Sequence, residues 1–162
     1  MIAPVYRTRP IALAILAIAG ATIGGALVSQ QVFGLAPCKL CLIQRWPYYA
    51  GVPLAALTAY LPPGGPRRVG FALLALVFLV SAGLGAHHAG VEWGFWPGPI
   101  DCAGDAGAAP PRVDDFLKQL DGARVVNCAD AAFRVLGLSL AGWNALISLA
   151  LAAIAIRGAT IR

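Results

Sequence analysis

Four cysteines, arranged as two pairs, are the residues of this chain whose type and spacing could do chemistry. Cys38 and Cys41 form a C-x-x-C motif, and Cys102 and Cys128 follow much later. The C-x-x-C spacing recurs in redox-active sites because the attacking and resolving thiols are already adjacent. A disulfide that closes so short a loop restrains little of the unfolded chain and contributes little to stability. We therefore interpret Cys38 and Cys41 as a redox-active pair.

The residues around Cys41 favour a thiolate at that position. An apolar stretch begins directly after Cys41, and a helix starting there would direct the positive end of its dipole toward the sulfur. Arg45 would lie one turn further along the same helix face, and Lys39 adds a second positive charge nearby. Arg45 is equally well explained as an interfacial residue whose charged head reaches the water.

The second pair has the opposite electrostatic surroundings. Asp101 adjoins Cys102, and Asp130 follows Cys128 by two residues. Carboxylates disfavour a neighbouring thiolate, so the C-x-x-C disulfide should be the stronger oxidant and should receive electrons from this second pair. The alternative is a structural disulfide between Cys102 and Cys128. Four cysteines allow three pairings, and the sequence does not choose among them, although bridges within each loop are the simplest resting arrangement.

Composition and charge patterning place these cysteines in a membrane protein. The chain has 162 residues, of which 59% are hydrophobic and only 12% are charged, which excludes an ordinary soluble enzyme and intrinsic disorder. Leaving histidine aside, residues 10–38, 46–66, 69–91 and 135–156 contain no charged side chain, and each stretch can hold one crossing of about 20 residues. We predict an all-α integral membrane protein, a single domain over 1–162 whose four transmembrane helices lie near 11–28, 42–61, 69–88 and 136–156.

Basic residues set the predicted orientation of this four-helix bundle. Lys and Arg are densest in the two tails and in the turn between the second and third spans, as is typical of cytoplasmic segments. Both termini are therefore expected in the cytoplasm, and the loops 29–41 and 89–135, with all four cysteines, in the oxidising compartment outside. The first span also resembles a signal peptide, but no clear A-x-A cleavage site follows it, so we expect it to be retained. The net charge of +5 then belongs to span ends and indicates no nucleic-acid partner.

The second loop contains a predicted short amphipathic helix. Val113, Phe116, Leu117 and Leu120 fall at positions i, i+3, i+4 and i+7, with polar residues between them. Such a helix either lies on the bilayer surface or packs on the loop itself.

A redox pair at the lipid edge needs an electron acceptor, and a quinone dissolved in the membrane fits that position. Trp46, Tyr48 and Tyr49 adjoin the pair, although aromatic residues here also fit an interfacial belt. His87 and His88 end the third span on the same side. Either histidine could lie near the quinone, and either could simply cap the helix.

The segment 37–45, which reads PCKLCLIQR, resembles the P-C-x-L-C-x-x-x-R motif of the bacterial disulfide bond formation protein B family, the quinone-linked membrane thiol oxidases. Cys128 and Ala129, followed by Leu-Gly-Leu at 136–138 and by Trp143, resemble that family's approach to its last span. The likeness covers nearly the whole chain, including both cysteine pairs.

This resemblance implies a series of disulfide exchanges. A reduced periplasmic dithiol oxidase with a thioredoxin fold, similar to DsbA, would attack Cys102 and free Cys128. Cys128 would then attack Cys38 and liberate Cys41 as a thiolate against a quinone, with Arg45 holding the ring and its charge. The resemblance also implies a monomer in the bacterial inner membrane that uses ubiquinone or menaquinone.

Three other interpretations compete with this one. A non-catalytic four-span protein could use both disulfides only to brace its outer loops. A zinc site of four thiolates is a poor fit because the spacing, two residues, then 60, then 25, is unlike compact zinc patterns, so we expect no metal. The vitamin K epoxide reductase type is also a quinone-linked four-span protein, but the resemblance implies that its C-x-x-C follows the loop pair, whereas here it comes first.

Overall fold

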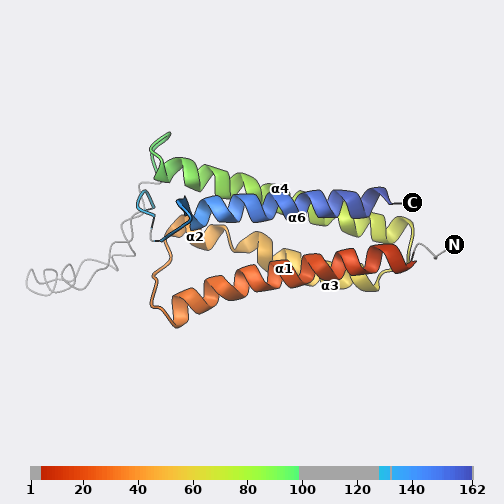
Figure 1. Ribbon diagram of the computed structural model, residues 1–162. Coiled ribbons are helices and arrows are strands. Elements are labelled where there is room, and N and C mark those ends of the chain that lie inside the picture. The colour runs from red at the N-terminus through yellow and green to blue at the C-terminus, as the bar shows by residue number, and fades with distance from the viewer. Residues whose placement is uncertain (1–4, 99–127, 132, 162) are drawn as a thin grey trace, which may run out of the picture.

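Long helices that run alongside one another form the protein (Figure 1). The computed structural model describes residues 5–98, 128–131 and 133–161. Helices α1, α4 and α6 are the long ones, joined by the shorter α2 and α3 and by a two-stranded hairpin, with these bounds: α1 Val5–Gln31, α2 Lys39–Ile43, α3 Trp46–Tyr60, α4 Gly65–Glu92, β1 Arg134–Val135, β2 Leu138–Ser139 and α6 Leu140–Thr160. Helix α4 packs along α6 and α1 packs along α3, while the start of α1 and the end of α6 lie at the same end of the bundle (Figure 1).

Small residues let these helices approach closely, while large apolar side chains face outward. A methyl group added at Gly85 of α4 would come within 2.8 Å of the backbone nitrogen of Ala145 in α6. Leucines such as Leu76 and Leu57 are exposed, which suits a surface covered by lipid. The buried core consists mainly of alanines around a few larger side chains, among them Ile15, Phe71, Leu74, Phe78 and Leu151.

Three helices are long and apolar enough to cross a membrane, namely residues Thr8–Gln31 of α1, Gly65–Glu92 and Leu140–Thr160. They confirm helices at the first, third and fourth predicted spans. The predicted second span, near 42–61, is divided between α2 and the 15-residue α3. At 1.5 Å per residue α3 is about 22 Å long, shorter than a hydrocarbon core of about 30 Å. The count of four spans therefore stays a prediction.

Pro47 explains why the chain breaks between α2 and α3. Proline lacks the N–H that a continuous helix would need at this position. Pro47 instead occupies the first turn of α3, where no such donor is required. The break leaves Gln44 and Arg45 between the two helices, directly after the C-x-x-C motif.

The predicted fourth span, 136–156, is wrong at its start. Residues 134–139 form an antiparallel hairpin in which Arg134 pairs with Ser139 and Val135 with Leu138. Leu136 and Gly137 make its turn with φ of 53° and 80°. Ser139 then caps α6, which begins at the next residue.

Two other helices are longer than predicted. Helix α1 ends at residue 31 instead of 28 and α4 ends at residue 92 instead of 88, so both predicted loops are shorter. The predicted amphipathic helix at 113–120 lies outside the described residues.

Candidate redox site

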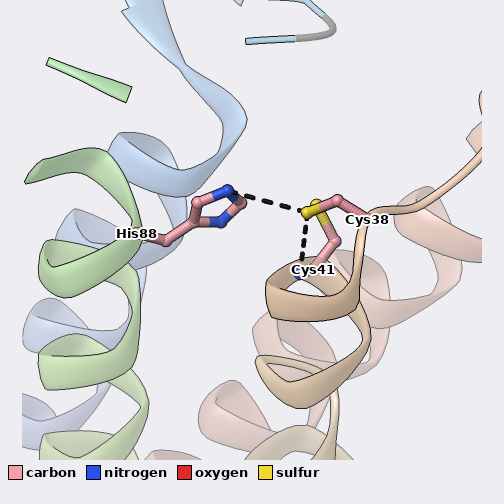
Figure 2. Close-up of side chains that lie close together, drawn as sticks. All are labelled: Cys38, Cys41 and His88. Carbon is pink, nitrogen blue, oxygen red and sulfur yellow. Dashed lines mark hydrogen bonds between the residues drawn. The ribbon is translucent and has the colours of Figure 1, made fainter. Parts of the chain in front are cut away.

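The C-x-x-C motif forms the first turn of α2. Cys38 is the N-cap of this helix, and its sulfur accepts a hydrogen bond of 3.1 Å from the backbone N–H of Cys41. The helix therefore starts at Lys39, earlier than expected, so its first turn surrounds the motif. Both cysteines are free thiols, and their sulfur atoms lie 2.6 Å apart (Figure 2). Because a disulfide needs about 2.05 Å, only a small movement separates this arrangement from a bond.

The two thiols differ strongly in acidity. The hydrogen bond to Cys41, together with burial, raises the pKa of Cys38 to about 12. The same hydrogen bond lowers the pKa of Cys41, because Cys41 accepts it and is stabilised as a thiolate. The direction agrees with the sequence prediction, but its main cause is Cys38 rather than Arg45.

Arg45 lies at the break between α2 and α3, where α1 fixes its side chain. Its Nη1 donates a hydrogen bond of 2.6 Å to the Oε1 atom of Gln30 in the last turn of α1. Arg45 and Cys41 both line a cavity of about 380 Å³ between α1, the start of α3 and α6. The structure therefore brings together the two residues that the sequence placed one turn apart.

The structure distinguishes between the two neighbouring histidines. His88 is 3% exposed, and its Nε2 lies 3.7 Å from the sulfur of Cys38 (Figure 2). His87 is exposed and stacks on Trp96 with ring centroids 5.6 Å apart, while the Trp96 Nε1 donates to the His87 carbonyl oxygen. Only His88 therefore belongs to the site.

Cys128 belongs to the same cluster. It is 1% exposed, and its carbonyl oxygen lies 3.2 Å from the Nε2 of His88. One cysteine of the second pair is thus held against the histidine that also faces Cys38. Cys102, the other predicted member, lies outside the described residues.

Sequence reasoning missed a set of polar residues inside the bundle. Gln44 is nearly buried and hydrogen-bonds both His88 and Asn144. Tyr48 extends this network, since its hydroxyl contacts Asn144 and Ser148, and Ser148 donates to Ser81. A usable signal was present, because polar side chains within a membrane-spanning segment usually have partners and a function.

The cavity beside Cys41 has a mainly apolar lining that includes a few polar residues, as small-molecule sites commonly do. Its apolar lining comes mainly from α1 and α6. The polar residues of the lining include Cys41, Gln30, Gln44, Arg45, Tyr48, His88 and Asn144. The site can therefore hold a largely apolar molecule and offer hydrogen bonds to its oxygen atoms next to a thiolate.

A metal ion fits the cysteine pair less well. The ligand atoms of Cys38, Cys41 and His88 all lie within 4.8 Å of one another. Two thiolates on one tetrahedral zinc ion stand about 3.8 Å apart. The 2.6 Å between these sulfurs is closer to the geometry of a dithiol that becomes a disulfide.

The chain is similar to known bacterial proteins over most of its length. Residues 8–157 match the family model described as disulfide bond formation protein DsbB. A protein of Marinobacter nauticus named disulfide bond formation protein B is 35% identical over 128 residues, covering 74% of this chain and 73% of its own. Proteins of the same name from Nitrosospira multiformis and Saccharophagus degradans are 34% and 33% identical, each covering 94% of this chain and 92% of its own. No solved structure shows a significant match.

Proposed function

The chain belongs to the DsbB family of disulfide bond formation proteins, and on this premise we propose that it reoxidises a periplasmic, DsbA-like dithiol oxidase and passes the electrons to a quinone. The resemblance first seen at residues 37–45 is thereby confirmed, and the chain is a bacterial multi-pass membrane protein with a role in disulfide formation. The acceptor, the partner and the individual steps belong to the proposal.

The proposed thiol exchange begins at Cys102 and continues through Cys128. In the proposed cycle the partner's thiolate attacks Cys102 of a Cys102–Cys128 disulfide, so that Cys128 leaves as a thiolate. Cys128 then attacks the sulfur of Cys38 in a Cys38–Cys41 disulfide. The Cys38–Cys128 bond forms, the Cys38–Cys41 bond breaks, and the electron pair stays on Cys41. The contact that holds Cys128 at His88, beside Cys38, supports this step.

The position of Cys41 carries the proposal. Cys41 lines the apolar cavity, whereas Cys38 faces His88, which also contacts Cys128. The C-x-x-C pair therefore lies between Cys128, of the second cysteine pair, and the cavity. A bound quinone supplies the acceptor for two electrons and two protons. Arg45 and Asn144 would hold its carbonyl oxygens, because each offers a donor within the cavity lining, whereas Gln44 directs its –NH2 group to His88 and the Leu40 carbonyl.

The proposed orientation places the cysteines outside. The start of α1 and the end of α6 lie at one end of the bundle and the C-x-x-C motif lies at the other (Figure 1). Arg9, Arg67 and Arg157 belong to the end where α1 starts and α6 ends, which suits the cytoplasmic side of an inner membrane. In this arrangement α3 is the second of four crossings, and α2 lies at its outer end.

The test is anaerobic mixing of the detergent-purified protein with a reduced periplasmic dithiol oxidase and a quinone, following quinone absorbance. Wild type should reduce many equivalents of quinone, while Cys41→Ser and Cys102→Ser should reduce none. A wild-type protein that leaves the quinone oxidised, with disulfides inert to mild reductant, would instead be the non-catalytic protein with structural disulfides.

A further inference from the structure

A chain of hydrogen bonds leads from the middle of the bundle to His88. The Tyr48 hydroxyl donates to Asn144 Oδ1 at 2.8 Å, and Asn144 Nδ2 donates to Gln44 Oε1 at 2.6 Å. Gln44 Nε2 in turn lies 2.6 Å from His88 Nδ1. These four residues come from α3, α6, the α2–α3 break and α4, so the chain connects elements far apart in the sequence.

The orientation of the Gln44 amide follows from its second neighbour. The same Gln44 nitrogen lies 3.4 Å from the carbonyl oxygen of Leu40, which can only accept a hydrogen bond. An amide oxygen in that place would face another oxygen. The –NH2 group of Gln44 therefore points toward His88, and the Nδ1 of His88 must accept its hydrogen bond.

The contacts of the other ring nitrogen, Nε2, independently indicate the same protonation state of His88. Its Nε2 lies 3.2 Å from the carbonyl oxygen of Cys128, which again can only accept. Nε2 must therefore carry a hydrogen. A donor on one side of the ring and an acceptor on the other leave one arrangement, the neutral imidazole with its proton on Nε2.

We propose that Gln44 and Asn144 are positioning residues that fix His88 as the Nε2–H tautomer, so that His88 donates to the Cys128 carbonyl and toward the Cys38 sulfur and does not accept a thiol proton. Asn144 acts by holding the oxygen of Gln44, which keeps the amide nitrogen turned to the ring. The consequence for the cycle rests on the proposed function: His88 holds Cys128 within reach of Cys38 for the exchange.

Glu92 favours a second proton on His88, so the amide of Gln44 is needed to keep the ring neutral. Its Oε1 lies 3.8 Å from the Nε2 of His88, and its Oε2 is buried without a hydrogen-bond partner among the residues that the structure describes. A carboxylate there favours an imidazolium, which would need a second proton on Nδ1. The –NH2 group of Gln44 opposes that proton, because two donors would then face each other.

The experiment uses the single-histidine background His87→Ala, since the chain has only two histidines. Nitrogen NMR of the ¹⁵N-histidine protein in detergent should show one protonated nitrogen, Nε2, and one unprotonated nitrogen, Nδ1. Adding Gln44→Glu replaces the donor by an acceptor of the same shape, and Nδ1 should then become protonated. Gln31→Glu, at the exposed end of α1, should leave the spectrum unchanged.

A proton on Nδ1 in the His87→Ala protein, or an unchanged spectrum after Gln44→Glu, would overturn the inference. Where Gln44→Glu does not fold, Asn144→Ala serves instead: the released amide should yield a mixture of both tautomers, and a single Nε2–H form would count against the role of Asn144. This measurement needs neither partner nor quinone, so its failure is distinct from a failure of quinone reduction.

Discussion

The Nε2 atom of His88 lies 3.2 Å from the carbonyl oxygen of Cys128, so the last turn of α4 holds one cysteine of the second pair next to the first pair. Cys128 and Cys38 belong to segments 90 positions apart in the chain, and His88 contacts both. Disulfide exchange between two loops requires such a meeting point, since an unplaced thiol would have to find its target by diffusion of the loop.

His88→Ala should slow exchange between the two cysteine pairs by roughly tenfold, because the contact with the Cys128 carbonyl is lost. The matched control is His87→Ala, one residue away on the same helix but exposed and stacked on Trp96, which should behave as wild type. Rapid quenching followed by mass spectrometry of the mixed disulfide measures the rate. Equal slowing in both variants would show a general effect on the end of α4.

The acidity of the two thiols predicts which one reacts with an alkylating reagent. The pKa of Cys41 lies below its ordinary value of 9.0 and that of Cys38 is raised to about 12. As pH rises from acid, Cys41 becomes a thiolate first, so iodoacetamide should label Cys41 before Cys38. Peptide mass spectrometry of the reduced protein reads the labelled site.

Cys38→Ala provides the check on the cause. It removes the hydrogen bond that stabilises the Cys41 thiolate, so the onset of Cys41 labelling should move to higher pH. Lys39→Ala, which leaves that hydrogen bond in place, should move it less. Preferential labelling of Cys38 in the wild-type protein would contradict the assignment of the thiolate.

The hydrogen bond between Arg45 and Gln30 predicts a role in binding the acceptor. Gln30→Ala removes the hydrogen bond that ties the Arg45 guanidinium to α1, and Arg45→Lys replaces the planar set of N–H donors by a single ammonium group. Each change should raise the KM for quinone by about tenfold while exchange with the protein partner stays near wild type. Arg68→Lys, exposed near the start of α4, is the control. A loss of protein exchange with an unchanged KM would place Arg45 in the thiol step instead.

Charge patterning was enough to predict most of the bundle, because a long uncharged stretch has few stable forms other than a membrane helix. It failed at residues 136–139, where Leu136 and Leu138 are apolar but the backbone turns at Leu136 and Gly137. Hydropathy does not report φ, so a tight hairpin next to an apolar helix looks like part of the span. The break before α3 was more accessible, since Pro47 stands in the first turn after it.

The residues of the candidate site that were predictable from the sequence are its cysteines and the arginine of the C-x-x-C motif. Cys38, Cys41 and Arg45 fall within one motif, and the structure places them around one short helix and its end. The choice between His87 and His88 depends on which of two adjacent helix positions faces the neighbouring elements, and the sequence gives no such direction. Gln44 and Asn144 lie 100 positions apart, so their hydrogen bond is a product of tertiary packing.

The close approach of α4 to α6 predicts an unequal response of two neighbouring glycines. A methyl group at Gly85 would meet the backbone of α6, 2.8 Å from the Ala145 nitrogen, whereas one at Gly83 meets nothing within 4 Å. Gly85→Ala should therefore lower the free energy of unfolding by about 1–3 kcal/mol, because backbone cannot move aside as a side chain can. Gly83→Ala should be neutral or stabilising by up to about 1 kcal/mol, since alanine is the better helix former.

Thermal unfolding of both variants in the same detergent measures this difference. Because α4 carries His88 and α6 carries Asn144, a separation of the two helices should also disturb the Gln44–Asn144 hydrogen bond. Gly85→Ala should then lose quinone reduction at temperatures where it is still folded, and Gly83→Ala should retain it. If Gly85→Ala were as stable and as active as Gly83→Ala, the packing of α4 on α6 would not be what positions the site.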